Sequence, residues 1–179
     1  MSAPTHYTSQ YNRVSQVIHW VSALLILGMF PLGLIMHELP DGAQKQIMYN
    51  IHVTVGLMVI VVTVFRLVWL ARRRWPEPLP ELSPLRLKLF TATHVFLYIA
   101  LVVALLSGIA MVISSGLLPM PGTIDPERIR DLPPRMIHDI FSKLLFVALI
   151  IHVVGVIDYQ VRKGDTLFRM GITVFRKNS

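Results

Sequence analysis

Long apolar runs without a formal charge divide this chain into segments of membrane-spanning length. Val17–Met36 contains no Asp, Glu, Lys or Arg, and Ile47–Leu70 contains only Arg66, near its end. Leu89–Leu118 is the longest uncharged run. A helix needs about 20 mainly apolar residues to cross the bilayer core. We therefore expect membrane-spanning helices over about residues 14–36, 47–70 and 89–116.

A fourth apolar stretch, Ile137–Val161, is interrupted by charges. Asp139 and Asp158 lie near its ends, and Lys143 is long enough to bring its ammonium group toward the membrane surface. We expect a fourth helix over about residues 137–161. The four spans predict an all-α fold in which residues 1–179 form one domain, a transmembrane up-down-up-down four-helix bundle.

Composition supports the membrane class and narrows the chemistry. Of the 179 residues, 54% are hydrophobic and only 15% are charged, against roughly 25% charged in soluble proteins. Cysteine is absent, which excludes disulfides, thiolate-ligated iron–sulfur clusters and covalently attached haem. Any haem must therefore be held non-covalently.

The net charge of +7 is unevenly distributed along the chain. Basic residues outnumber acidic ones between the second and third spans and in the C-terminal tail, whereas the other two connections are balanced. Cytoplasmic loops of membrane proteins carry the excess of Lys and Arg. We therefore expect a multi-pass membrane protein with both termini and the middle loop in the cytoplasm.

Histidines in the apolar spans are the main candidates for chemistry. His138 and His152 are fourteen residues apart, so on one helix they face the same side, about 21 Å apart along the axis. The predicted topology places His19 at the depth of His152, and His52 at the depth of His138. Each pair is suited to ligating one haem iron from both sides, which leaves no open position and favours electron transfer.

Other interpretations of these histidines stay open. A single histidine in a membrane helix also bonds neighbouring backbone or lines a proton path. Zinc is a further alternative, although it usually takes a tighter cluster that often includes Cys, Asp or Glu. A buried ring without a partner is costly in lipid, and the two depth-matched pairs favour two haems.

Residues near these histidines are candidates for supporting roles. His94 is suited to a hydrogen bond between helices, or to a haem propionate or a quinone carbonyl. Arg13, Arg66 and Arg135 suit propionates, although Arg13 and Arg66 also suit membrane anchoring. The glycines within the spans suit close approach of a flat macrocycle or ordinary helix packing; they are Gly28, Gly56, Gly108 and Gly155.

Basic residues of the two outer connections form another candidate group. Lys45, Arg128, Arg130 and Arg135 are expected on the outer side, near His52 and His138. Such a group is suited to steering a small anion toward that end. Acidic residues of the same loops nearly cancel this charge, so a simple solvated loop is the alternative.

Several motifs resemble the prokaryotic cytochrome b561 family, which is related to the membrane cytochrome b subunits of nickel hydrogenases and formate dehydrogenases. The likeness covers roughly residues 10–170 and is carried by Tyr11–Trp20 (YNRVSQVIHW), Asn50–Val53 (NIHV), Val64–Arg66 (VFR), Thr93–Tyr98 (THVFLY), Ile137–Asp139 (IHD) and Lys163–Met170 (KGDTLFRM). The resemblance implies four helices and two b-type haems. Their axial ligands would fall on His19, His52, His138 and His152.

The resemblance also implies a direction for function. Stand-alone members are similar to a bacterial enzyme that oxidises superoxide and reduces ubiquinone. We expect a dihaem cytochrome of the bacterial inner membrane that passes electrons from superoxide, or another donor at the outer face, to ubiquinone. One alternative is a membrane anchor subunit that reduces quinone for a hydrogenase- or dehydrogenase-type partner. Another is a helical transport bundle without a redox cofactor.

Overall fold

The structure is a computed structural model that describes residues 10–72, 83–115, 125–163 and 166–172. Its long helices are α1 (Arg13–Glu38), α2 (Ala43–Arg72), α3 (Pro84–Ser114) and α5 (Pro133–Lys163), and its short ones are α4 (Pro126–Arg130) and α6 (Thr166–Arg169). The described residues contain no strand. The long helices are apolar and long enough to cross a membrane. The predicted all-α arrangement of four spans is confirmed, the charged fourth span included.

The helices extend beyond the predicted spans because polar residues start and stop them. Asn12 caps α1 by accepting a hydrogen bond from the Ser15 amide at 2.8 Å. Ser83 caps α3 in the same way, and Pro84 occupies its first turn. α1 ends at Glu38, and the extended backbone of Leu39, its C-cap, is typical of a residue before proline. The predicted third span ran to residue 116, which lies outside the described residues; α3 ends at Ser114.

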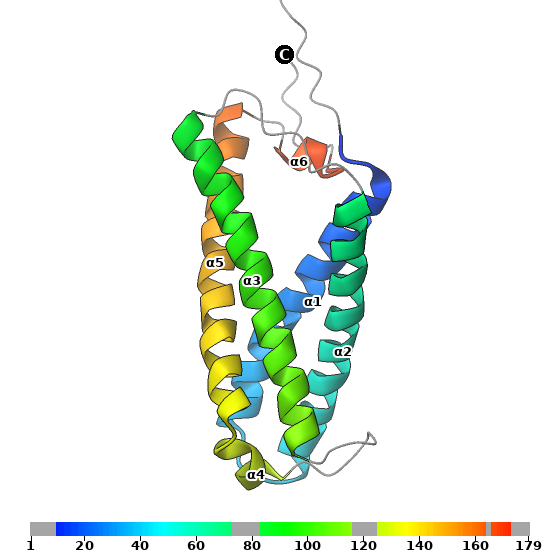
Figure 1. Ribbon diagram of the computed structural model, residues 1–179, viewed down its shortest axis with the longest axis vertical. Coiled ribbons are helices and arrows are strands. Elements are labelled where there is room, and N and C mark those ends of the chain that lie inside the picture. Colours follow the sequence, from blue (N-terminus) through cyan, green and yellow to red (C-terminus); the bar gives the residue numbers. More distant parts are fainter. Residues whose placement is uncertain (1–9, 73–82, 116–124, 164–165, 173–179) are drawn as a thin grey trace, which may run out of the picture.

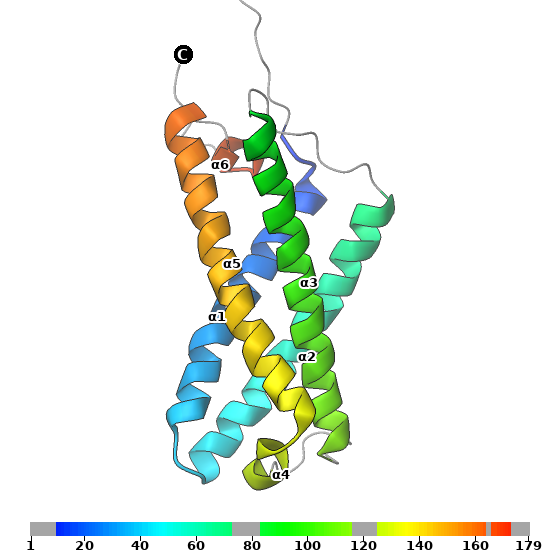
Figure 2. The ribbon, with the colours of Figure 1, turned by 60° about the vertical axis from the view of Figure 1, so that its left-hand side comes forward.

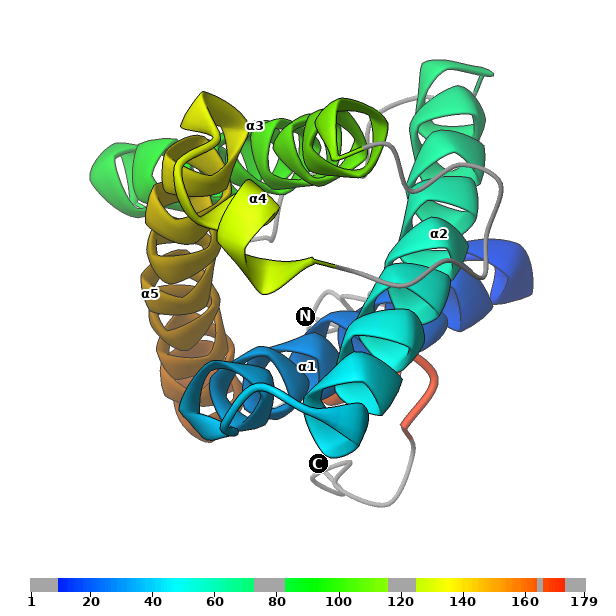
Figure 3. The same cartoon turned by 90° about the horizontal axis from the view of Figure 1, so that it is seen from below.

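The four long helices form two antiparallel hairpins. α1 packs closely on α2 and α3 packs closely on α5, while α2 and α3 make few backbone contacts. The views from the side and along the axis show the four helices around a common centre (Figures 1 and 3). α4 lies at one end of the bundle and α6 at the other (Figures 1 and 2). We call these the α4 end and the α6 end.

Small residues bring α3 close to α5, and the rest of the core is thin. Ala100, Ala104 and Ser107 lie on one side of α3 and are buried. Short side chains at such spacing let membrane helices approach each other. Among the described residues, no large side chain is completely buried. Most large apolar side chains are instead exposed at the surface, as expected for helices surrounded by lipid.

The α6 end is fastened to the start of α1 by hydrogen bonds. The Tyr11 amide donates to the Arg169 carbonyl at 3.0 Å. Gln16 Nε2 lies 2.9 Å from the Tyr11 carbonyl and 3.2 Å from the Arg169 carbonyl. Trp20 Nε1 donates to the Met170 carbonyl at 2.9 Å. Because Trp20 follows His19, these bonds hold α6 across the end of the bundle beside that histidine.

The α4 end is covered by an apolar contact. Ile129 of α4 is buried and packs against Tyr49 and Val53 of α2 and against Met111 and Val112 of α3. α4 therefore joins the two hairpins at the end opposite α6.

Gly171 gives a test of how firmly the α6 end is fastened. Its φ of +87° disfavours L side chains, and a Cβ there would lie 2.7 Å from Gln16 Oε1. We expect Gly171→Ala to destabilise the docked segment by about 1–2 kcal/mol from backbone strain alone, and to loosen the Gln16 hydrogen bonds. Faster proteolysis of the C-terminal segment in detergent would report this.

The matched control is Gly28→Ala, where a Cβ meets nothing within 4 Å. Alanine is a better helix former than glycine, so this variant should match or exceed the parent. Equal protease resistance of the two variants would contradict the strained docking of Gly171.

Candidate functional site

The four histidines singled out within the membrane-spanning helices lie close together in the two expected pairs. The ring centroids of His19 and His152 are 6.4 Å apart, and those of His52 and His138 are 6.2 Å apart. In both pairs one ring comes from the α1–α2 hairpin and the other from α5. Each pair therefore bridges the two hairpins, and α5 contributes to both.

The ring spacing fits one metal atom between each pair. A metal–imidazole bond of about 2.0–2.1 Å on each side, plus roughly 1.1 Å from each nitrogen to its ring centre, separates the centroids by about 6.3 Å. The rings are too far apart to be hydrogen-bonded to one another. The described residues contain no cluster of three or more His, Asp or Glu side chains able to hold a metal ion. The arrangement thus suits two-ligand axial coordination better than a zinc site.

Hydrogen bonds set the orientation of the His138 ring. Its Nδ1 lies 2.8 Å from the Ala104 carbonyl and 3.3 Å from Ser107 Oγ. A carbonyl only accepts, so Nδ1 carries the proton and Nε2 is left to bind a metal. Ser107 in turn donates to the Ala104 carbonyl at 2.9 Å. The small residues that pack α3 on α5 therefore also orient this histidine.

The His52 ring, which is paired with His138, has fewer hydrogen bonds. His52 Nδ1 is buried and has no hydrogen-bond partner among the described atoms. An unpaired buried nitrogen is unfavourable, and this one lies on a ring that faces His138. The orphaned atom is consistent with a site built to hold another group.

Two glycines lie next to the rings of this pair, where a side chain would come close to the imidazole. A Cβ on Gly108 would lie 3.4 Å from His138 Cε1, and one on Gly33 would lie 3.8 Å from His52 Cε1. Gly28 and Gly155 have nothing within 4 Å of such a Cβ. Of the glycines singled out in the sequence, Gly108 alone contacts a pairing histidine, and Gly33 was missed.

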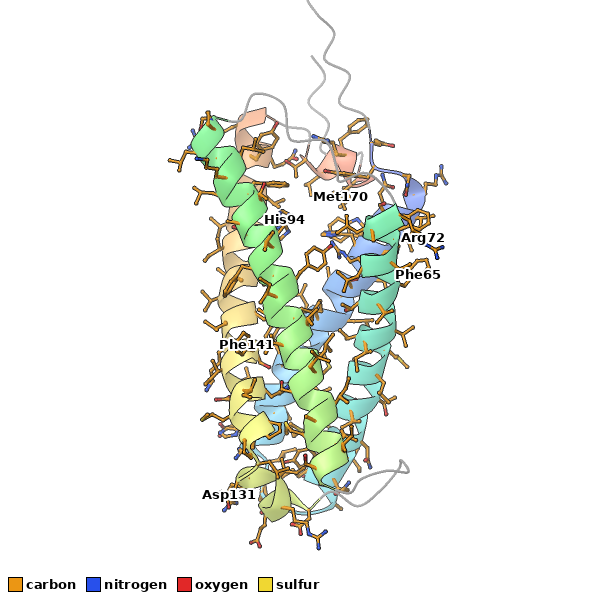
Figure 4. All side chains as sticks on the ribbon, viewed as in Figure 1. Phe65, Arg72, His94, Asp131, Phe141 and Met170 are labelled. Atoms are coloured by element: carbon orange, nitrogen blue, oxygen red, sulfur yellow. The ribbon has the colours of Figure 1, made fainter. Side chains whose placement is uncertain are left out.

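At the α6 end, the pair lies in a polar cluster. Arg66 Nη2 lies 3.2 Å from His19 Nδ1, and Arg66 Nε donates to the Tyr98 hydroxyl at 2.8 Å. The His94 ring packs edge-on against His152 with centroids 4.9 Å apart. Figure 4 shows His94 on the part of α3 nearer α6. Arg66 and His94 therefore lie where the sequence placed them, beside one histidine pair.

His94 departs from the expected hydrogen bond between helices. Its Nδ1 lies 2.7 Å from the carbonyl of Phe90, one turn earlier in the same helix. This bond puts the proton on Nδ1 and leaves Nε2 as an acceptor. Arg13 is exposed in the first turn of α1 and forms no ion pair with a described residue.

The candidate cations between α1 and α2 and between α3 and α5 gather at the α4 end, where most of them form local bonds. Lys45 pairs with Asp41 at 2.9 Å, and Arg128 pairs with Asp125 at 3.5 Å. Arg135 donates to the Arg130 carbonyl at 3.1 Å, while Arg130 itself is exposed.

Two contributors at the histidine pairs were not identified from the sequence. Tyr98 anchors Arg66, and Ser107 supports His138. The only signals were a tyrosine one turn after His94 and a serine before Gly108 in an apolar run. Neither reveals a partner on another helix.

Comparison with known proteins gives one family and a curated relative. A family model described as prokaryotic cytochrome b561 matches residues 10–171. A protein named cytochrome b561 homolog 2, from Escherichia coli (strain K12), is 32% identical over 114 residues. That alignment covers 63% of this chain and 60% of the relative, less than two thirds of its length.

Gly108 tests whether the His52–His138 pair forms a cofactor site. We expect Gly108→Leu to push the His138 ring from its place and to lower the haem content of the purified protein. Gly108→Ala is the matched control, because its Cβ would make an ordinary contact at 3.4 Å. Haem extracted per mole of purified protein measures the difference, and equal haem in both variants would contradict this placement.

Proposed function

This chain belongs to the prokaryotic cytochrome b561 family, which makes it a multi-pass membrane b-type cytochrome for electron transfer, and we propose that it carries electrons from a donor at the outer face to ubiquinone. We further propose superoxide as that donor. The observation that carries the proposal is the meeting of four histidines in two bridging pairs, with ring centroids 6.4 and 6.2 Å apart.

In this proposal, His19 with His152 and His52 with His138 each hold one haem b. Iron held by two imidazoles has no open position and changes between ferric and ferrous states, so it passes single electrons. The spacing of fourteen positions from His138 to His152 separates the ligand sites by about 21 Å along α5. Because both ligands lie on α5, this helix sets the distance between the two proposed haem sites.

Arginine and histidine side chains are suited to the haem carboxylates. Arg66 lies against His19 and is our first candidate for a propionate at the α6 end. Arg13 and Arg135 remain candidates at the two membrane surfaces. His94 Nε2 is an acceptor in the neutral ring, which suits a quinol hydroxyl better than a carboxylate.

The placement in the membrane follows from charge. We propose that the α6 end faces the cytoplasm of a bacterium and that the protein lies in the inner membrane. The basic tail after α5 and the basic connection after α2 support this orientation. The α4 end then faces outward.

Each end of the bundle supports one partner of the reaction. At the α4 end, Lys45, Arg128, Arg130 and Arg135 favour the approach of an anion as small as superoxide. At the α6 end, α6 and its hydrogen bonds to Gln16 and Trp20 cover the bundle toward water. A lipid-soluble acceptor that arrives between helices, such as ubiquinone, suits this closure.

The proposed reaction balances. Two superoxide ions each give up one electron and leave as dioxygen. Ubiquinone takes both electrons and two protons to form ubiquinol. The chain supplies the histidine ligands of the haems, the cations that attract superoxide and the apolar helices around the haems. No other oxidant or reductant is needed.

The histidine pairs are tested by removing one ligand at a time. We expect His19→Ala and His52→Ala each to lower the haem content from two per chain to one, because one axial ligand of one site is lost. His37→Ala is the control, since His37 is exposed and belongs to neither pair. Haem content that is unchanged in both pair variants would contradict the ligand assignment.

Superoxide oxidation is tested by rapid mixing of the purified protein with a superoxide source and ubiquinone. We expect haem reduction followed by ubiquinol formation. Arg128→Gln with Arg130→Gln should lower the second-order rate about tenfold at low salt, and less at high salt, because steering is screened. Lys143→Gln is the control, because Lys143 lies on α5 away from α4.

Haem reduction no faster than in a His52→Ala, His138→Ala variant would refute superoxide as the donor. Copurification of an iron–sulfur subunit would instead favour an anchor role.

A further inference from the structure

Arg66 is a charged residue within a membrane span, and it lacks an acidic partner among the residues that the structure describes. The side chain is half-buried on α2, and no described Asp or Glu forms an ion pair with it. A cation at such a position is unfavourable and usually functional. Its contacts are with Tyr98 and His19.

The charge acts on the whole α6-end cluster. Arg66 Nη2 lies 3.2 Å from His19 Nδ1, and the His152 ring lies next to both His19 and His94, with centroids 6.4 and 4.9 Å away. The bond from Arg66 Nε to the Tyr98 hydroxyl, 2.8 Å long, keeps the guanidinium there. This anchor does not depend on the proton position of His19, which changes when Nε2 binds a metal.

The α4-end pair has a different electrostatic environment. Among the described residues, no arginine or lysine is hydrogen-bonded to either ring of this pair: His52 Nδ1 has no partner, and His138 Nδ1 faces Ala104 and Ser107. His138 faces the negative end of the Ala104 carbonyl dipole at 2.8 Å. The described cations at this end lie on α4 and at the starts of α2 and α5, where Lys45 pairs with Asp41 and Arg135 donates to the Arg130 carbonyl, and none of them is hydrogen-bonded to the His52 or His138 ring. Asp139 is likewise paired with Lys143.

From this asymmetry we propose that Arg66 makes the His19–His152 haem easier to reduce than the His52–His138 haem, and so biases electrons toward the α6 end. The inference rests on the dihaem function proposed above. Reduction adds one negative charge to a site, which a neighbouring cation favours. A hydrogen bond from His138 to a carbonyl makes that ligand more electron-donating and favours the oxidised form.

The step is a one-electron exchange between the two sites. One iron is oxidised, the other is reduced, and no proton or further reactant takes part. In the proposed orientation the electron moves toward the cytoplasm, against an inside-negative membrane potential. A higher midpoint potential of the haem at the α6 end would offset the effect of the membrane potential on this transfer.

The test isolates each site before removing the charge. His52→Ala leaves the α6-end haem alone, and His19→Ala leaves the α4-end haem alone. Spectroscopic redox titration then gives one midpoint potential per protein. We expect the α6-end haem to have the higher potential. Adding Arg66→Gln should lower its reduced-to-oxidised ratio at fixed potential about tenfold, which is about 59 mV for one electron.

Control variants separate charge from structure. Arg66→Lys keeps the charge and should stay near the parent value. Arg72→Gln removes an exposed cation from the same helix and should shift the potential little. Arg66→Gln in the His19→Ala background should leave the α4-end haem nearly unchanged. Arg66→Gln should also lower the midpoint potential if Arg66 binds a haem propionate. The substitution would then leave a negative carboxylate without its cation, which disfavours the reduced form.

Several results would overturn the proposal. These are an unchanged or raised potential in Arg66→Gln, an equal shift at both sites, or a higher potential at the α4 end in the parent. If Arg66→Gln loses its haem, Tyr98→Phe is read instead, and it should give a smaller downward shift because the guanidinium loses its anchor. Loss of all haem in His52→Ala alone would refute the dihaem function rather than the charge effect.

Discussion

Two pairs of imidazole rings at metal-bridging distance are the constraint on which the rest of the structure depends. The α1–α2 and α3–α5 hairpins pack closely within themselves, yet α2 and α3 make few backbone contacts. Both histidine pairs cross from one hairpin to the other. Without a bridging group these rings are partly buried polar atoms in lipid, which is unfavourable. Ligation would turn the same atoms into the link between the two halves.

The two pairs resemble each other in spacing but not in surroundings. His138 faces a carbonyl supported by Ser107, whereas His19 faces the guanidinium of Arg66. Each end is also closed differently, by the apolar contact of Ile129 at α4 and by hydrogen bonds from the side chains of Gln16 and Trp20 to backbone carbonyls at the α6 end. A nearly symmetric ligand set within an asymmetric field is suited to moving charge in one direction.

Much of this architecture is predictable from the sequence, and the failures have physical causes. The apolar runs predict all four long helices, and helical spacing with topology predicts which histidines meet. α4 and α6 escape prediction because such short helices are held by contacts with distant residues. The bonds of Arg66 to Tyr98 and of Ser107 to His138 depend on how each helix is rotated against its neighbours. Glycine shows the same limit, since a Cβ at Gly108 would contact His138 while one at Gly28 would meet nothing within 4 Å.

The central claim, one haem b between each histidine pair, is tested most directly by electron paramagnetic resonance of the oxidised, purified protein together with haem quantification. The account predicts two haems per chain, both low-spin because each iron has two imidazole ligands. A single haem per chain, or a high-spin signal from an iron with an open position, would contradict it.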